Sequence, residues 1–130
     1  MIRPRVTILA EEEGWLVVDK PHSLQIHPKK PGGPPTLWDA LRELLAYEQV
    51  NGGQVSIINR LDRETSGVVL VAKTAEAARM FHQAMKQRAF SKEYLAIVRG
   101  WPVGDDFEVD APILRQGEVE PSAIYVKRRV

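Results

Sequence analysis

The sequence predicts a mixed α+β fold, and three observations support this. Short apolar runs rich in β-branched residues recur along the chain between turn-forming residues, which is typical of strands. Only two segments carry a convincing helical spacing of apolar residues. The length of 130 residues suits one domain or part of one, with a core of moderate size. We therefore expect a sheet of several strands with helices packed beside it.

Two strands are expected first, at Val6–Leu9 and Trp15–Asp19. The second is apolar enough to lie inside a sheet, and it ends at Lys20-Pro21 because proline cannot donate to a neighbouring strand. Residues Gln25–Pro28 predict a third, short strand. The segment Lys29–Pro35 is rich in proline and glycine and predicts a loop.

The first helix is expected to begin after Thr36, a residue that can cap it, with Asp39 at the acidic position of a capping box. It should end within residues 47–53, and Val55–Ile58 should form a short strand. After a buried strand that ends at Ala72, Thr74 can cap a second helix that continues to about Arg88. The apolar stripes of these helices comprise Leu37, Ala40, Leu41, Leu44 and Leu45 in the first, and Ala77, Ala78, Phe81, Ala84 and Met85 in the second.

The most informative stretch is a charged, turn-forming segment that leads directly into that buried strand, Asn59-Arg60-Leu61-Asp62-Arg63-Glu64-Thr65-Ser66-Gly67. Its residues alone leave two interpretations open, a solvated surface loop or a loop that holds a reacting carboxylate at the edge of a rigid sheet. Because Asp62 lies between Arg60 and Arg63, we expect its carboxylate to be ionised. Thr65 and Ser66 can stiffen the turn through hydrogen bonds to the backbone, and Gly67 permits conformations that other residues resist.

This stretch resembles the His-Arg-Leu-Asp-x-x-Thr-Ser-Gly signature of the RluA-type pseudouridine synthases, with Asn59 in place of the usual histidine. Two further segments resemble the same family in the right order. They are Val17-Val18-Asp19-Lys20-Pro21 followed by Leu24 and His27-Pro28, and Lys92-Glu93-Tyr94-Leu95-Ala96-Ile97-Val98-Arg99-Gly100. The last of these predicts a buried strand, and Phe107–Asp110 and Ala123–Val126 predict two more.

The resemblance implies a largely antiparallel, curved sheet with flanking helices, and it implies that residues 1–130 form one partial catalytic domain. It also implies the isomerisation of uridine to pseudouridine in transfer or ribosomal RNA, through one ionised and desolvated carboxylate and without a cofactor or metal. Asp62 is the candidate for that carboxylate, Tyr94 for stacking on the base or removing its proton, and Arg60 for holding a phosphate or filling the place of a flipped-out nucleotide. The candidate substrate contacts are Leu61, Thr65, Ser66, Gly67, Lys20 and Lys92.

Composition limits the other functional classes. The net charge is +1, so an RNA-binding surface must be a local patch, and Lys86, Arg88, Lys92 and Arg99 make one part of the chain basic. There is no cysteine, no apolar run long enough to span a bilayer and no signal-peptide pattern, so the cytoplasm is the expected location. His22 and His27 are expected to be turn and packing residues, because no cysteine or carboxylate cluster accompanies them.

Nothing near Val130 matches the segment that, in the family, supplies a basic partner for the catalytic aspartate. We therefore expect a sheet that is incomplete at its C-terminal side, with an unpaired edge through which chains could associate. Two alternatives to an active enzyme follow. One is a catalytically silent RNA-binding remnant of the family, and the other is an interaction domain that pairs its exposed edge with a partner strand.

Overall fold

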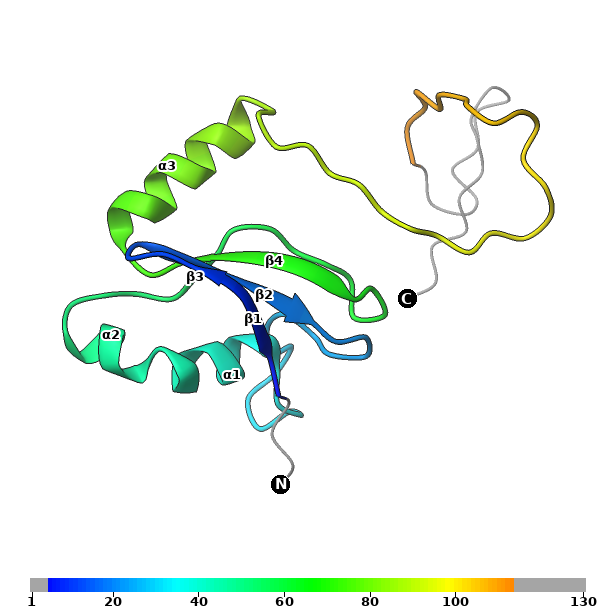
Figure 1. Cartoon of the computed structure of the whole chain (residues 1–130). Helices are drawn as coiled ribbons and strands as arrows, with labels where there is room; N and C mark the ends of the chain where they lie inside the picture. Colours follow the sequence, from blue (N-terminus) through cyan, green and yellow to red (C-terminus); the bar gives the residue numbers. More distant parts are fainter. Residues whose placement is uncertain (1–4, 114–130) are drawn as a thin grey trace. The chain divides into compact units, whose positions relative to one another are not determined.

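The computed structural model describes residues 5–113, and the chain divides into two units after Lys92 (Figure 1). The first unit contains every helix and strand found among the described residues. The second unit, from Glu93 onward, has none in its described part. The two units are therefore described separately.

The first unit is built on a four-stranded antiparallel sheet with the strand order β1-β2-β4-β3. The strands are β1 (Thr7–Glu11), β2 (Trp15–Lys20), β3 (Ser56–Ile57) and β4 (Gly67–Ala72). The central pair β2 and β4 is in register from Trp15 opposite Ala72 to Lys20 opposite Gly67. The predicted α+β class, the antiparallel sheet and the central position of β2 are confirmed.

Helices cover the two faces of this sheet (Figure 1). On one face, α1 (Leu37–Leu44) contributes Leu37 and Leu41 to a core that also holds Leu16 and Val18 of β2. On the other, α3 (Ala75–Lys86) packs its buried alanines beside Ala72 of β4. Alternate residues of β4 therefore belong to different cores, Val69 and Val71 to the first and Ala72 to the second, as the two-residue period of a strand requires.

Both helices begin as expected. Thr36 and Asp39 form a reciprocal capping box at the start of α1, and the Thr74 hydroxyl accepts a 3.2 Å hydrogen bond from the Ala77 amide at the start of α3. The end of α1 differs from the expectation. The helix breaks at Leu45, which is buried, and a separate short helix α2 (Ala46–Val50) follows.

The strand predicted at Gln25–Pro28 is wrong. The Gln25 carbonyl accepts a 2.8 Å hydrogen bond from the Leu37 amide, and the Ile26 carbonyl accepts one of 3.0 Å from the Trp38 amide. These are the amides that a helix leaves without partners at its N-terminus. The extended segment therefore completes the start of α1 and does not join the sheet.

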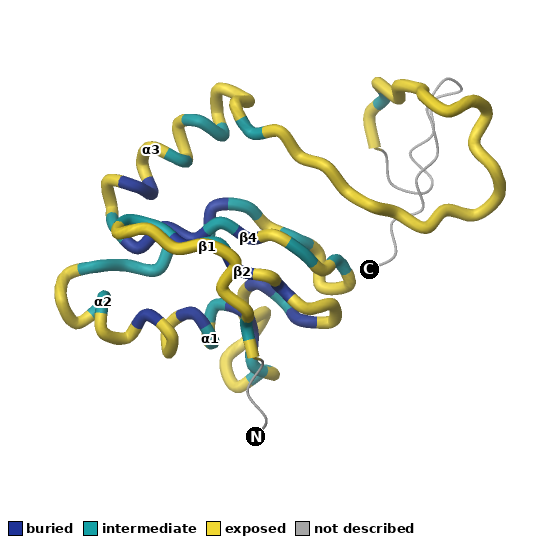
Figure 2. Tube along the Cα trace, in the orientation of Figure 1, coloured by how far each residue is buried: buried dark blue, intermediate teal, exposed yellow. Residues whose placement is uncertain are grey.

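The strands predicted at residues 92–100 and 107–110 are also wrong for this structure. Residues 93–113 form no strand, and all of them except the half-buried Ala111 are exposed (Figure 2). A strand needs a neighbour for its amides and carbonyls, and no described segment pairs with these residues. The strand predicted at residues 123–126 lies outside the described residues. In residues 5–113, no helix has the length and apolar character needed to cross a membrane.

Candidate active site

The signature loop, residues 59–67, connects β3 to β4 at one edge of the sheet. Just before it, the Ile58 amide donates a 2.9 Å hydrogen bond to the Leu70 carbonyl, which continues the pairing of β3 with β4. Within it, the Thr65 amide donates a 3.1 Å bond to the Asp62 carbonyl and closes a turn. The loop is therefore a turn whose start is fixed to a rigid strand.

Asn59 fastens the start of the loop to β4. Its side-chain oxygen accepts a 2.7 Å hydrogen bond from the Leu70 amide, and its side-chain nitrogen donates a 3.0 Å bond to the Val68 carbonyl. The side-chain amide thus takes the place of a paired backbone segment at the point where β3 has ended. Sequence reasoning noted Asn59 only as a departure from the family's histidine, although an asparagine directly after a strand is a signal for such side-chain-to-backbone bonding.

Lys20 holds the signature loop through the backbone carbonyl of Arg63. Its side chain is fully buried, and its ammonium donates hydrogen bonds to the carbonyls of Leu24 at 2.8 Å, Pro21 at 2.9 Å and Arg63 at 3.2 Å. Burial lowers the pKa of Lys20 below its ordinary value of 10.5, and the Glu64 carboxylate opposes this shift. The prediction that Lys20 contacts the substrate is therefore corrected, because all three donors of its ammonium are used inside the protein.

Two further contacts and one unusual backbone conformation shape the loop. Leu61 is half-buried and packs against the core beneath α1. The Arg63 guanidinium donates a 3.4 Å hydrogen bond to the Ser23 carbonyl, which links the loop to the segment after β2. Gly67 has a φ of +127°, a value that side chains strongly disfavour, where the loop enters β4.

Asp62 and Arg60 are exposed on this loop, and among residues 5–113 neither side chain has a hydrogen-bond or ion-pair partner. Among residues 5–113 no ion pair joins the Asp62 carboxylate to Arg60 or Arg63, and Arg63 turns toward Ser23 and lies 3.9 Å from Glu64. The expected desolvation of Asp62 is also absent from this structure. What the loop provides is a carboxylate held on a fixed backbone and open to a ligand.

The remaining predicted site residues are divided between the two units. Thr65 is half-buried and Ser66 is exposed on the signature loop, and Lys92 is exposed at the end of the first unit. Tyr94 belongs to the second unit and is 61% exposed. The structure therefore gathers Arg60, Leu61, Asp62, Thr65, Ser66 and Gly67 on one loop, to which Lys20 is bonded, while Tyr94 belongs to the other unit.

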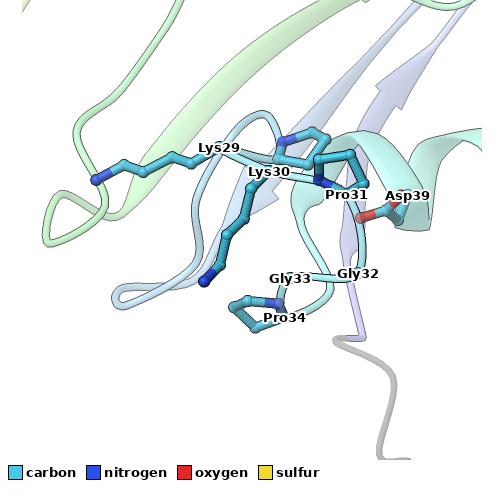
Figure 3. A pocket seen from close by; sticks show the side chains of 8 residues that line it. Lys29, Lys30, Pro31, Gly32, Gly33, Pro34 and Asp39 are labelled. Carbon is cyan, nitrogen blue, oxygen red and sulfur yellow. The ribbon is translucent and has the colours of Figure 1, made fainter.

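Other features of the first unit lie away from these residues. Residues 5–113 contain no cluster of three histidine or carboxylate side chains that could hold a metal. An open hollow of about 420 Å³ is lined by Lys29, Lys30, Asp39 and the intervening proline and glycine residues (Figure 3). No predicted catalytic or substrate-binding residue lines this hollow.

Comparison with known proteins gives consistent matches. A family model described as RNA pseudouridylate synthase matches residues 14–128. The chain is 35% identical over 108 residues to the ribosomal large subunit pseudouridine synthases C of Pasteurella multocida and of Escherichia coli K12. Each match covers 83% of this chain and 32% of the relative, so the chain spans about a third of the length of these relatives.

The fold has a counterpart among solved structures. Human RNA pseudouridylate synthase domain containing 4 matches with a TM-score of 0.51 and 24% sequence identity, over 63% of this chain and 30% of the human chain. At that identity the likeness concerns the fold alone.

Proposed function

The chain belongs to the RNA pseudouridylate synthase family, and on that premise we propose that it isomerises uridine to pseudouridine in RNA, with Asp62 as the catalytic carboxylate. The observation that carries the proposal is the geometry of the signature loop. Asn59, Lys20 and Arg63 fasten its backbone on both sides, while the Asp62 carboxylate is exposed and unpaired among the described residues. A fixed backbone that presents a free reactive group is the arrangement that catalysis requires.

The reaction breaks the bond between the ribose and the base nitrogen, turns the uracil and joins the ribose to a ring carbon. No atom is lost or gained overall, because one proton leaves the ring carbon and one proton is taken up by the released nitrogen. A carboxylate close to the junction of sugar and base can act on either of them. Binding of the RNA would supply the desolvation that Asp62 lacks in this structure, because a nucleotide placed on the loop excludes water from it.

Arg60 and Tyr94 complete the proposed machinery. The exposed Arg60 is two residues from Asp62, where its guanidinium can hold a phosphate or occupy the place of the flipped-out nucleotide. Tyr94 would stack on the uracil or take its proton. Leu61, Thr65, Ser66, Gly67 and the exposed Lys92 would contact the substrate, while Lys20 acts as a positioning residue through the Arg63 carbonyl.

Large-subunit ribosomal RNA is the favoured substrate, since both relatives named above are described as acting on the large ribosomal subunit. Transfer RNA is the other substrate class to test. The cytoplasm is the proposed location, because both RNAs are used there. Association of chains through the sheet edge is a further part of the proposal, because β1 is an exposed edge strand with a partner on one side only.

A silent RNA-binding remnant is the second candidate. It is favoured by the setting of Tyr94, which is exposed and lies in a unit whose described residues form no helix or strand. Such a protein would bind RNA with an affinity that falls as salt rises, and would form no pseudouridine.

Pseudouridine formation is the decisive measurement. The 130-residue chain is incubated with unmodified large-subunit ribosomal RNA and, separately, with unmodified transfer RNA, beside Asp62→Asn and the control Asp105→Asn. Asparagine keeps the shape of the side chain but removes its charge and nucleophilic oxygen, so we expect no product from Asp62→Asn. The control changes an exposed carboxylate in the second unit and should retain activity.

Each outcome has a distinct meaning. Product that depends on Asp62 supports the enzyme, and the RNA that is modified identifies the substrate class. RNA binding without product, from a folded wild-type chain, supports the silent remnant. Equal product from wild type and Asp62→Asn would remove Asp62 from the mechanism.

A further inference from the structure

A basic surface lies on the segment between β2 and α1 and on α1 itself. It consists of His27, Lys29 and Lys30, from the segment between β2 and α1, together with Trp38 and Arg42 of α1. We call these five residues the basic ledge. Trp38 is half-buried and the other four are exposed. The ledge borders the hollow of Figure 3, which Lys29 and Lys30 line.

The centre of the ledge is a stack of charged and aromatic groups. The Arg42 guanidinium carbon lies 4.7 Å from the centroid of the Trp38 ring, and the His27 ring lies 6.5 Å from the same ring at an angle of 47°. A cation above an indole face is attracted to the ring, so the guanidinium has a preferred plane. An arginine held in this way loses less conformational entropy when it binds a phosphate or stacks on a base.

The positive charges of the ledge have no ion-pair partners among the described residues. None of Lys29, Lys30 and Arg42 forms an ion pair with a carboxylate in residues 5–113. Asp39 lines the same hollow as Lys29 and Lys30. One of its carboxylate oxygens already accepts hydrogen bonds from the Thr36 amide at 2.8 Å and the Thr36 hydroxyl at 2.7 Å. Two lysines and a carboxylate that is engaged in capping α1 thus line the same hollow.

The same capping contacts decide what the ledge could bind. The first amides of α1 donate to Gln25, Ile26 and the Thr36 hydroxyl, so the helix terminus offers no free donors for a bound anion. Recognition must therefore come from the side chains at the surface. In Figure 3 the Lys29 side chain extends away from Pro31 and Pro34, and Lys30 lies along the side of Gly33 and Pro34. Charges spread in this way suit an extended polyanion better than one small anion.

The ledge is also connected to the signature loop. Ser23, whose carbonyl accepts the hydrogen bond from Arg63, is four residues before His27. Four residues of extended chain span at most about 14 Å, so the ledge begins within the length of a few nucleotides from the loop. An RNA strand with its uridine at Asp62 could therefore continue onto the ledge.

We propose that the basic ledge binds the RNA backbone beside the uridine that is modified, with Arg42, oriented by Trp38, as its principal contact. This inference rests on the proposed function. Trp38 serves as a platform for Arg42, and Lys29 and Lys30 add charge along the strand. The plainer interpretation is that Arg42 and Trp38 form a pair four residues apart that only stabilises the surface of α1.

RNA affinity of the full 130-residue chain tests the proposal. Binding to a fluorescent single-stranded oligouridylate and to unmodified large-subunit ribosomal RNA is measured at several salt concentrations. For Arg42→Gln we expect weaker binding to the single strand. The slope of log affinity against log salt should also become shallower, by about 0.7 for each phosphate that the variant no longer neutralises. Arg42→Lys should restore the slope without restoring the affinity, because lysine keeps the charge but lacks the planar guanidinium.

Two variants separate recognition from charge and from stability. Trp38→Leu removes no charge, so a loss of affinity with unchanged circular dichroism would reveal the platform. Arg79→Gln removes one charge from α3, where Arg79 lies 3.4 Å from Glu76, and should leave binding unchanged.

The outcomes distinguish this inference from the proposed function. Equal effects of Arg42→Gln and Arg79→Gln, or no effect of either, would overturn the ledge while leaving the role of Asp62 intact. Equal affinity for polyglutamate would overturn it in favour of general polyanion attraction. Absence of RNA binding by the wild-type chain would overturn both proposals. RNA binding that depends on Arg42 without pseudouridine formation would support the ledge and count against the enzyme.

Discussion

The two units of the chain show what apolar periodicity can and cannot determine. In the first unit the alternating residues of β2 place Leu16 and Val18 in a core, because α1 covers that face of the sheet. In the second unit Leu95 and Ile97 are likewise two residues apart, yet both are exposed. The apolar pattern predicts which side chains would be buried if the segment formed a strand. Those side chains are buried only where a neighbouring strand or helix covers them, because the backbone amides and carbonyls need hydrogen-bond partners before the segment can be removed from water.

The largest expected contrast between the units is in stability. Leu41→Ala removes a fully buried side chain from the core beneath α1 and should lower the free energy of unfolding by about 2–5 kcal/mol. The matched change Leu95→Ala, at an exposed site of the second unit, should alter it by less than about 0.5 kcal/mol. Urea unfolding followed by circular dichroism measures both. Similar losses for the two variants would mean that the second unit also contributes a packed core.

A second comparison concerns two lysines of the proposed site. Lys20→Met leaves the carbonyls of Pro21, Leu24 and Arg63 without their donor, and should cost about 1–3 kcal/mol of folding free energy. Lys92→Met, at an exposed position, should cost less than about 0.5 kcal/mol. Urea unfolding measures both variants, and a small effect of Lys20→Met would contradict its assignment as a positioning residue.

The same lysine gives a dependence on pH. The folded-state pKa of Lys20 is below 10.5, so the unfolded chain binds more protons than the folded chain as pH rises toward that value. Stability contributed by this group therefore increases with pH through the window that ends near 10.5. Lys20→Met should remove that increase. Unfolding curves of the two proteins from neutral pH upward provide the check, and identical slopes would disagree with the lowered pKa.

A smaller effect is expected at Asn59. Asn59→Ala removes the two side-chain bonds to β4 and should cost about 1–2 kcal/mol, with increased hydrogen exchange at the amide of Leu70. Asn51→Ala is the control, because the Asn51 side chain bonds only the nearby Tyr47 carbonyl in an exposed turn. Unchanged exchange at Leu70 would show that Asn59 does not hold the signature loop.

The smallest expected effect is at the start of α1. Thr36→Ala removes half of the capping box and should cost about 1 kcal/mol. Thr36→Ser keeps the hydroxyl and should restore most of that stability. Thermal unfolding of both variants measures the difference, and equal midpoints for the alanine and serine variants would mean that the hydroxyl does not cap the helix.

The signature loop itself was found from sequence, because its residues are consecutive and their types and order are distinctive. The contacts that hold the loop in place were not predicted from the sequence. Lys20 was predicted to contact the substrate, since nothing in a linear sequence reveals that the carbonyls of Pro21, Leu24 and the distant Arg63 accept bonds from its ammonium. Asn59 looked like a neutral replacement, and its bonds to Val68 and Leu70 depend on strand pairing across the loop.

The sequence by itself determined the elements whose signals are local. The capping residues Thr36 and Thr74, the strand at β4 and the loop around Asp62 depend on neighbours within a few positions, so they can be identified without a fold. Only the tertiary structure decided that Gln25 and Ile26 cap α1, that Lys20 is buried and that residues 93–113 form no strand. The physical reason is that each of these outcomes depends on which group binds a given amide, carbonyl or charge. Those groups lie far apart in the sequence, so the sequence alone does not show which of them are partners.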